Sequence, residues 1–309
     1  MTTQELEGLV AKFRKLPPSD DMSLEQVRDG MRFFETALPA PDDARVDVIE
    51  TNGVAAEWVR APNVADDANN PGRVLLYLHG GGYTYCGPGT HRLLAYNLSA
   101  ATGMPCLLPD YRLAPEHPFP AAVDDAVAAY GWLLAQGYDA GRIAIGGDSA
   151  GGGLTVATML ALKQTAQPLP GAAVCISPWT DMTMSGASID GRAAADPMVQ
   201  RSGLERCANW YLGGLGGDGG GDGDRENPLA SPHFGDLTGL PPLLIQVGSN
   251  EVLLDDAARM AELAKKAGVE VNYQCWEEMF HVWQLYAPML SEGRDAIAKI
   301  GEFLDLHVA

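Results

Sequence analysis

The feature that most constrains the fold is a regular alternation of short, largely uncharged runs with longer amphipathic stretches from residue 74 onward. The short runs have the length and composition of β-strands, and they cover 74–79, 105–110, 142–147, 172–177, 242–248 and 271–276. Helical periodicity fills the intervals, at about 91–102, 120–136, 150–164, 253–267 and 290–306. Because strands without a polar face need cover on both sides, the pattern predicts an α/β fold with a mostly parallel sheet between two layers of helices.

An antiparallel hairpin is predicted ahead of this alternation. The β-like runs 46–51 and 54–60 are joined by Asn52-Gly53, a dipeptide that suits a tight hairpin turn. We expect the hairpin at one edge of the sheet. Two helices are expected before it, over 4–16 and 23–36, which either face the core or lie over a site as part of a lid.

One connection is much longer than the others. Residues 181–235 separate two successive strands, and within them 213–224 consist almost entirely of Gly and Asp. Connections of this length are usually functional lids or flexible segments, and we expect a flexible, solvated loop at 213–224. The alternative is a calcium site, but the spacing of the aspartates matches neither a Gly/Asp nonapeptide repeat nor an EF-hand loop.

The charge balance excludes one class of partner. The 309 residues include 40 Asp and Glu but only 21 Lys and Arg, which gives a formal net charge of −19. Nucleic-acid binding requires Lys and Arg to neutralise phosphates, so a nucleic-acid partner is not expected. The apolar fraction of 46% is that of a globular chain, and the length allows one large core. We assign the charge to solubility.

The cysteines and the apolar runs indicate the compartment. Five cysteines, an odd number with no two close in sequence, form neither a disulfide framework nor a metal knuckle; they are Cys86, Cys106, Cys175, Cys207 and Cys275. The first residues lack the apolar core of a secretory signal, and no apolar run approaches the roughly 18 residues of a membrane span. We therefore expect a cytoplasmic protein with no membrane partner.

The strongest local motif is Gly147-Asp148-Ser149-Ala150-Gly151, which follows a predicted strand and opens a predicted helix. This is the G-x-S-x-G nucleophile elbow in the context that it requires. The sharp turn strains the serine backbone, and glycines flank it because side chains there would collide with the neighbouring strand and helix. The helix N-terminus supplies positive potential where negative charge develops during a reaction. We predict that Ser149 is a nucleophile.

A second motif, His79-Gly80-Gly81-Gly82, comes directly after the strand at 74–79. An HGGG sequence in this position is typical of the oxyanion loop of lipases and esterases. We predict that the N–H groups of Gly81 and Gly82 form the oxyanion hole together with that of Ala150. His79 is expected to brace the loop through a hydrogen bond rather than to carry a proton.

The catalytic base must be one of six histidines: His79, His91, His117, His233, His281 and His307. In this fold the order along the chain is serine, acid, histidine. His307 lies in the C-terminal tail, and no acid-bearing strand end precedes His233. His281 follows the last predicted strand after a short loop, and we predict it to be the base.

The acid should lie just after the strand at 242–248. Glu251 is nearest to the strand end, whereas Asp255 and Asp256 come a turn later and suit the start of the next helix. We predict Glu251 as the triad acid, with Asp255 as the alternative. Asp148, beside the nucleophile, is expected to steady the oxyanion loop rather than to act as the acid.

Several motifs in the right order closely resemble the bacterial hormone-sensitive-lipase-like (family IV) esterases of the α/β-hydrolase superfamily. They are HGGGY (79–83), DYRLAPEHPFPAAVDD (110–125), GDSAGGG (147–153), SPWTD (177–181) and FHVWQ (280–284). The resemblance covers about 45–307, with no long unmatched stretch except 182–230. Glu251 departs from the family pattern, which has aspartate at the acid position. Within the second motif, we expect Arg112 and Glu116 to form a structural ion pair.

The resemblance implies an organisation and an activity. It implies an α/β-hydrolase catalytic domain made of 45–181 and 231–309, with a small helical cap made of 1–44 and 182–230. It also implies a serine carboxylesterase that acts on small-molecule esters with short to medium acyl chains, without a metal or another cofactor. Homodimers are common among similar proteins, but the sequence leaves the oligomeric state open. The apolar cap residues Phe33, Phe34, Trp210 and Tyr211 either line a substrate pocket or form the core of the cap.

Other activities remain open on the same residues. Close relatives that carry FHVWQ include lactone hydrolases, and a lactone is an internal ester that the same site could open. An amidase needs a harder leaving-group protonation, and nothing in the sequence distinguishes it. Plant gibberellin receptors share the fold but lack the triad histidine, so the presence of His281 disfavours a non-catalytic binding protein.

Overall fold

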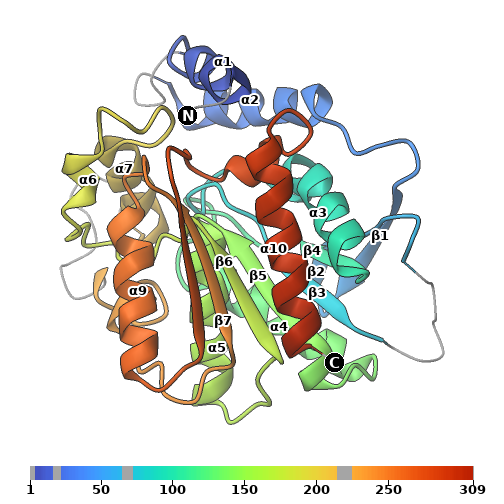
Figure 1. Ribbon diagram of the computed structural model, residues 1–309. Coiled ribbons are helices and arrows are strands. Elements are labelled where there is room, and N and C mark those ends of the chain that lie inside the picture. The colour runs from blue at the N-terminus through green and yellow to red at the C-terminus, as the bar shows by residue number, and fades with distance from the viewer. Residues whose placement is uncertain (1–3, 17–21, 65–71, 214–224, 309) are drawn as a thin grey trace.

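The computed structural model describes residues 4–16, 22–64, 72–213 and 225–308. Within them, eight strands form one sheet in the order β1-β2-β4-β3-β5-β6-β7-β8 (Figure 1). The strands are β1 (Arg45–Thr51), β2 (Val54–Arg60), β3 (Val74–Leu78), β4 (Cys106–Pro109), β5 (Ile143–Asp148), β6 (Ala172–Ile176), β7 (Leu243–Gly248) and β8 (Val271–Trp276). β2 pairs antiparallel with β1 and β4, and the other pairs are parallel. The predicted mostly parallel sheet with an antiparallel hairpin at one edge is confirmed.

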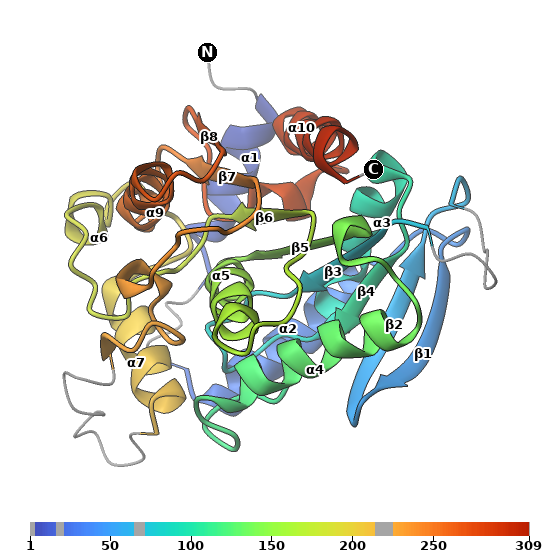
Figure 2. The same ribbon diagram turned by 90° about the horizontal axis from the view of Figure 1, so that it is seen from below.

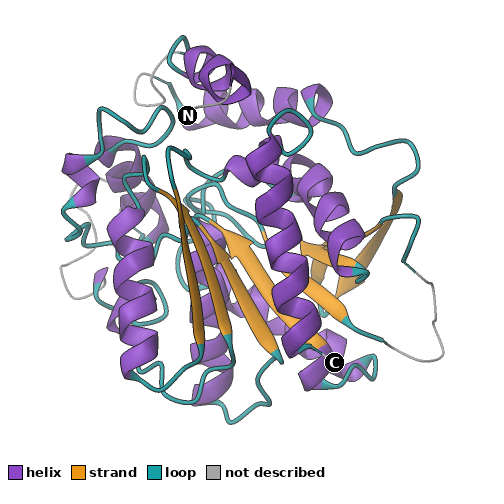
Figure 3. Ribbon diagram, in the orientation of Figure 1, coloured by secondary structure: helices purple, strands orange, loops and turns teal. Residues whose placement is uncertain are grey.

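Helices cover both faces of the sheet, as Figures 2 and 3 show. On one face lie α3 (Pro88–Thr102) and α10 (Ser291–His307), and on the other lie α4 (Ala121–Ala135), α5 (Ala150–Gln164) and α9 (Leu254–Lys266). Every residue of β3, β5, β6 and β7 is buried, whereas β1 and β8 at the edges are partly exposed. The central strands therefore lack polar alternation because both of their faces are covered.

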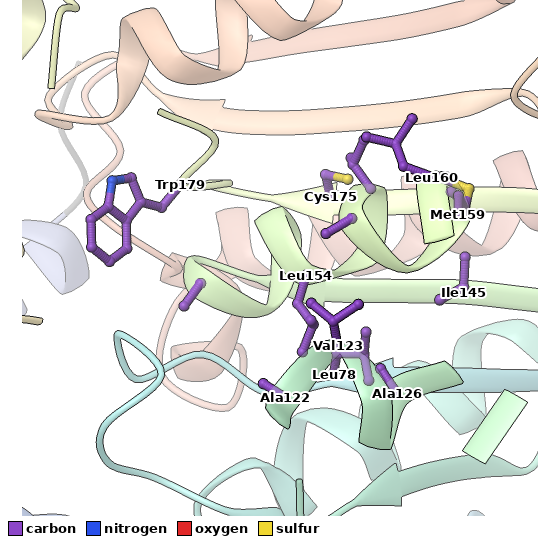
Figure 4. Packing of buried hydrophobic residues seen from close by; sticks show 14 of the residues in the cluster. Leu78, Ala122, Val123, Ala126, Ile145, Leu154, Met159, Leu160, Cys175 and Trp179 are labelled. Atoms are coloured by element: carbon purple, nitrogen blue, oxygen red, sulfur yellow. The ribbon is translucent and has the colours of Figure 1, made fainter. Parts of the chain in front are cut away.

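The core around α5 holds the nucleophile elbow in place. Leu154 of α5 points toward Val123 of α4 and Leu78 of β3, and all three side chains are almost completely buried (Figure 4). α5 begins with small residues, and its three glycines pack against the end of β3 and the loop after β6, where added side chains would collide. This close packing fixes the helix N-terminus beneath the carboxyl ends of β5 and β6.

Four further helices lie at the carboxyl ends of strands β5 to β8 (Figure 1). They are α1 (Gln4–Phe13), α2 (Leu24–Ala37), α6 (Ser188–Gly191) and α7 (Arg201–Tyr211). The first two match the predicted helices, while α6 and α7 lie in the long connection, where the resemblance implied helices but the sequence pattern gave them no bounds. α1 buries Leu6 and Leu9 in a cluster with Phe280, and Phe13 contacts Phe280 with ring centroids 5.2 Å apart. The N-terminal segment is thus packed on the loop that carries His281.

One predicted ion pair is wrong. Arg112 does not pair with Glu116: its guanidinium binds Asp125 at 2.7 Å. Glu116 instead receives two hydrogen bonds from Arg28 of α2, at 2.6 and 2.8 Å. Arg112 and Glu116 lie in an irregular loop rather than on a helix, so a spacing of four residues does not bring their side chains together.

The described residues also bear on membrane spans, metal sites and disulfides. No helix among them is both long and apolar enough to cross a membrane. In the same part of the chain, no group of three or more His, Cys, Asp or Glu side chains is arranged to hold a metal ion. None of the five cysteines, all of which are among the described residues, forms a disulfide. Of the Gly/Asp-rich segment, to which the calcium alternative applied, 214–224 lie outside the described residues.

Candidate active site

The carboxyl ends of four neighbouring strands bring the predicted residues to one edge of the sheet. Ser149 directly follows β5, Ser177 directly follows β6, Glu251 is the third residue after β7, and His281 lies in the loop after β8. These strands are parallel, and each is hydrogen-bonded to the next, so their carboxyl ends lie side by side. Residues far apart in the chain therefore converge where ligands bind in open α/β sheets.

Ser149 has the strained geometry of a nucleophile elbow. Its φ of 53° and ψ of −120° place a non-glycine residue at positive φ. Its N–H donates to the Ile176 carbonyl at 2.8 Å, and its own carbonyl accepts from Trp179 at 2.9 Å, so both neighbouring turns hold the strain in place. Ser149 is partly exposed, whereas Asp148 and Ala150 on either side are buried.

The glycines on either side of the elbow are required by close backbone contacts. A Cβ added to Gly147 would lie 2.4 Å from the carbonyl oxygens of Leu78 and Gly151. A Cβ on Gly151 would lie 2.0 Å from the Leu78 oxygen. No side chain fits at either position without moving the backbone, which is the reason the sequence motif demands glycine there.

His281 and Glu251 form a buried pair. Nδ1 of His281 lies 2.8 Å from Oε2 of Glu251, and the two residues are 7% and 0% exposed. Burial disfavours the charged imidazole, but the hydrogen bond to Glu251 and the charges of Glu251, Asp196 and Asp148 outweigh it. The net effect raises the pKa of His281 above its ordinary value of 6.5.

The second oxygen of Glu251 is held by other groups. Oε1 accepts a hydrogen bond from the Gly248 N–H at 2.6 Å and another from the Ser177 hydroxyl at 2.7 Å. The carboxylate is therefore fixed with Oε2 toward His281. The sequence offered no role for Ser177 beyond its place in the SPWTD motif; its position directly after a central strand was the available signal.

The alternative acid lies elsewhere. The Asp255 carboxylate accepts a hydrogen bond from the Ser188 N–H at 2.9 Å, at the start of α6. Asp256 accepts from the N–H groups of Thr180 and Asp181. Both carboxylates therefore anchor the chain that follows β6, and the structure brings Glu251 rather than either of them to His281.

The predicted oxyanion loop presents free N–H groups. Gly81 and Gly82 have φ values of 108° and 58°, and Gly81 accepts hydrogen bonds from Thr84 and Tyr85 through its carbonyl. Among the described residues, the N–H groups of Gly81, Gly82 and Ala150 have no hydrogen-bond acceptor. The Ala150 N–H is also one of the unpaired donors of the first turn of α5.

A buried network behind the loop holds it against the elbow. Oδ1 of Asp148 accepts from the Gly80 N–H at 3.2 Å and from the Tyr77 hydroxyl at 2.9 Å, and His91 Nε2 lies 3.2 Å from the same carboxylate. His79 is buried, and its Nδ1 lies 2.7 Å from the Gly80 oxygen. Burial lowers the pKa of His79 to about 3, so this imidazole stays neutral. Asp148 and His79 thus each contact Gly80 of the oxyanion loop, as expected of residues that hold the loop in place.

Helix α7 closes the outer side of the same loop. Sγ of Cys207 lies 3.4 Å from Oγ1 of Thr84, and a Cβ added to Gly82 would lie 2.7 Å from that sulfur. The ring of Tyr211 stacks on Tyr83 with centroids 3.9 Å apart. The segment between β6 and β7 thus contacts the loop that carries the predicted oxyanion donors.

Comparisons with known proteins agree with this architecture. A family model described as the alpha/beta hydrolase fold matches residues 75–285. The chain is 51% identical over 258 residues to an acetyl-hydrolase of Streptomyces hygroscopicus, covering 84% of this chain and 82% of the relative. It is 35% identical over 297 residues to an esterase of Acinetobacter venetianus, covering 96% and 94%.

A solved structure extends the likeness to the whole chain. The crystal structure of an esterase from the bacterial hormone-sensitive lipase family superposes with a TM-score of 0.91 at 45% identity, covering 100% of both chains. The match includes the helices at the carboxyl end of the sheet as well as the core. The chain therefore belongs to the α/β-hydrolase family, among the bacterial hormone-sensitive-lipase-like esterases.

Proposed function

We propose that this esterase hydrolyses small carboxylic esters through a triad of Ser149, His281 and Glu251 and an acyl-enzyme intermediate. The observation that carries the proposal is the buried 2.8 Å contact between His281 and Glu251, in the loops beside the strained serine elbow. The arrangement supplies a nucleophile, a base and a group that orients the base, in the order serine, acid, histidine.

In the first half-reaction, His281 accepts the proton of Ser149 while Oγ attacks the acyl carbonyl. The oxyanion of the tetrahedral intermediate accepts hydrogen bonds from the N–H groups of Gly81, Gly82 and Ala150, which need no reorganisation because they lack other acceptors. His281 then donates its proton to the leaving alcohol. Glu251 fixes the tautomer with Nδ1 protonated and stabilises the imidazolium.

In the second half-reaction, water takes the place of the alcohol. His281 removes a proton from the water, hydroxide attacks the acyl carbonyl, and the same donors hold the second tetrahedral intermediate. Collapse of this intermediate releases the carboxylic acid and returns the proton to Ser149. No cofactor is needed at any step.

We further propose that 1–44 and 182–230 form a cap and that the acyl group is short. Support comes from α7, whose Cys207 and Tyr211 pack directly on the oxyanion loop and limit the room beside Gly82. Tyr211 is fully buried against Tyr83, which favours a role in the cap core, whereas Phe33 is 72% exposed. The name of the Streptomyces relative, an acetyl-hydrolase, agrees with a small acyl group.

The test is a series of p-nitrophenyl esters from acetyl to dodecanoyl, assayed with the wild-type protein and Ser149→Ala. We expect the highest kcat/KM with the short chains and a loss of about 10⁴-fold or more in the variant. Matched p-nitroanilides and simple lactones are assayed in parallel. Near-normal turnover by Ser149→Ala would overturn the triad, and faster anilide than ester cleavage would make the protein an amidase.

A further inference from the structure

One buried hydroxyl lies between the loop of the acid and the loop of the base. Ser177 is 0% exposed, and its Oγ donates to Oε1 of Glu251 at 2.7 Å. The same oxygen accepts the N–H of Val282, the residue after His281, at 3.2 Å. We propose that Ser177 is a positioning residue that makes Glu251 competent as the triad acid; the inference rests on the triad proposed above.

A glutamate at this position needs such an anchor. Compared with aspartate, it has one more rotatable bond, so its carboxylate has more orientations to lose when it is fixed against an imidazole. The Gly248 N–H and the Ser177 hydroxyl both bind Oε1, and together they leave Oε2 for His281. Of these two donors, the hydroxyl is the one that a side-chain substitution can remove.

The contact with Val282 ties the base to the same anchor. Val282 has a φ of 51°, an unusual conformation for a β-branched residue, and its N–H points at Ser177 rather than into a helix or a strand. A serine hydroxyl has one donor and can accept two hydrogen bonds. At Ser177 the donor serves the acid and an acceptor serves the base loop, so one oxygen sets the separation of the two loops.

Ser177 has a backbone conformation that residues with a side chain rarely adopt. Its φ of 45° favours glycine or asparagine, and it is held by a hydrogen bond from its N–H to the Gln246 carbonyl at 2.7 Å. Glycine would relieve this conformation but would remove the hydroxyl. Ser177→Gly therefore removes the two hydrogen bonds of the hydroxyl without straining the backbone.

The test is a double-mutant cycle that uses Ser177→Gly, Ser177→Ala, Glu251→Ala and both Ser177 changes combined with Glu251→Ala. Initial rates of p-nitrophenyl acetate hydrolysis give kcat and KM, and thermal unfolding reports the stability of each variant. Ser99→Ala is the matched control. Ser99 is also 0% exposed, and its hydroxyl also donates one hydrogen bond and accepts one, but these join Met104 and Ala61 at the other end of the sheet.

We expect both Ser177 variants to lose roughly 10- to 100-fold in kcat with little change in KM. In the Glu251→Ala background the same changes should cost less than about twofold, because a residue that acts through Glu251 has nothing left to position. Ser99→Ala should change the unfolding temperature but not kcat.

The positioning role of Ser177 and the triad itself would be rejected by different outcomes. Full, additive losses from Ser177 changes in the Glu251→Ala background would reject the positioning role and leave the triad intact. A Glu251→Ala protein with normal kcat would reject the triad itself. If Ser177→Ala is poorly folded, Ser177→Gly decides alone; normal kcat in a folded Ser177→Gly protein would also reject the positioning role.

Discussion

His281 and Glu251 meet through a 2.8 Å contact between Nδ1 and Oε2, although 30 residues and the whole of α9 and β8 separate them along the chain. Both side chains are buried, so the charge that His281 acquires during the reaction is stabilised by Glu251 and not by water. The protonation of His281 before the reaction should therefore decide the pH range of activity.

The first prediction concerns this pH range. The pKa of His281 is raised above 6.5, and only the neutral imidazole accepts the serine proton, so kcat/KM should fall as the pH decreases through a value above 6.5. Glu251→Gln removes the negative partner and should move this acidic limb to lower pH while reducing the maximum rate. The measurement is kcat/KM for p-nitrophenyl acetate from pH 5 to pH 9. An unmoved limb in Glu251→Gln would show that another group titrates.

The second prediction distinguishes the two candidate acids. Glu251→Ala should lower kcat by several orders of magnitude, whereas Asp255→Ala should keep kcat within a few fold. Asp255 binds the Ser188 N–H at the start of α6, so its loss should lower the unfolding temperature instead. Kinetics and thermal unfolding of both variants provide the check, and a far larger activity loss in Asp255→Ala would move the acid role to that residue.

Local patterns were enough to predict the sheet and the site loops. The central strands are buried on both faces, so their burial leaves a continuous apolar run in the sequence, and the turn after β5 leaves a glycine pattern imposed by the Leu78 carbonyl. The order of the strands in the sheet was not predicted from the sequence. His281 could be chosen because chain order in this fold excludes the histidines that precede the acid, and His307 lies in the C-terminal tail.

Contacts between distant segments left no such pattern. Arg28 of α2 binds Glu116 and the Thr84 carbonyl, and no sequence pattern around these residues predicts the contacts. Helix α6 has only four residues, too few to show a helical period, and α7 follows it in a long connection whose helices were not located from the sequence pattern. Ser177 acquires its role only when β6 and β7 are placed side by side.

The third prediction concerns the oxyanion loop. Gly82→Ala places a methyl group 2.7 Å from the Cys207 sulfur at a φ of 58°, so either the loop or α7 must move. We expect a loss of about 10-fold or more in kcat, because displaced N–H groups no longer meet the oxyanion. Combining it with Cys207→Ala removes the sulfur and should restore part of the activity. Cys207→Ala alone is the control, and no restoration in the double variant would place the cause in the backbone conformation.

The last prediction concerns Asp256, a buried carboxylate outside the proposed mechanism. It is 0% exposed, its Oδ2 accepts the N–H groups of Thr180 and Asp181, and its Oδ1 has no hydrogen-bond partner. Burial raises its pKa to about 7; the nearby Asp181 carboxylate also raises it, while the two N–H donors and Arg259 oppose the rise. Between about pH 4 and pH 7, the folded protein therefore holds a proton that the unfolded chain has released.

The sign of the effect follows from this proton. The contribution of Asp256 to stability is full at low pH and is lost as the pH rises toward 7, by about 1.4 kcal/mol per pH unit at most. Asp256→Asn cannot ionise, and its amide oxygen can still accept the two N–H groups. Its free energy of unfolding relative to the wild type should therefore increase from pH 4.5 to pH 7 and then level off. Urea unfolding at four pH values measures this difference, and a constant difference between the two proteins would show that Asp256 is ionised throughout.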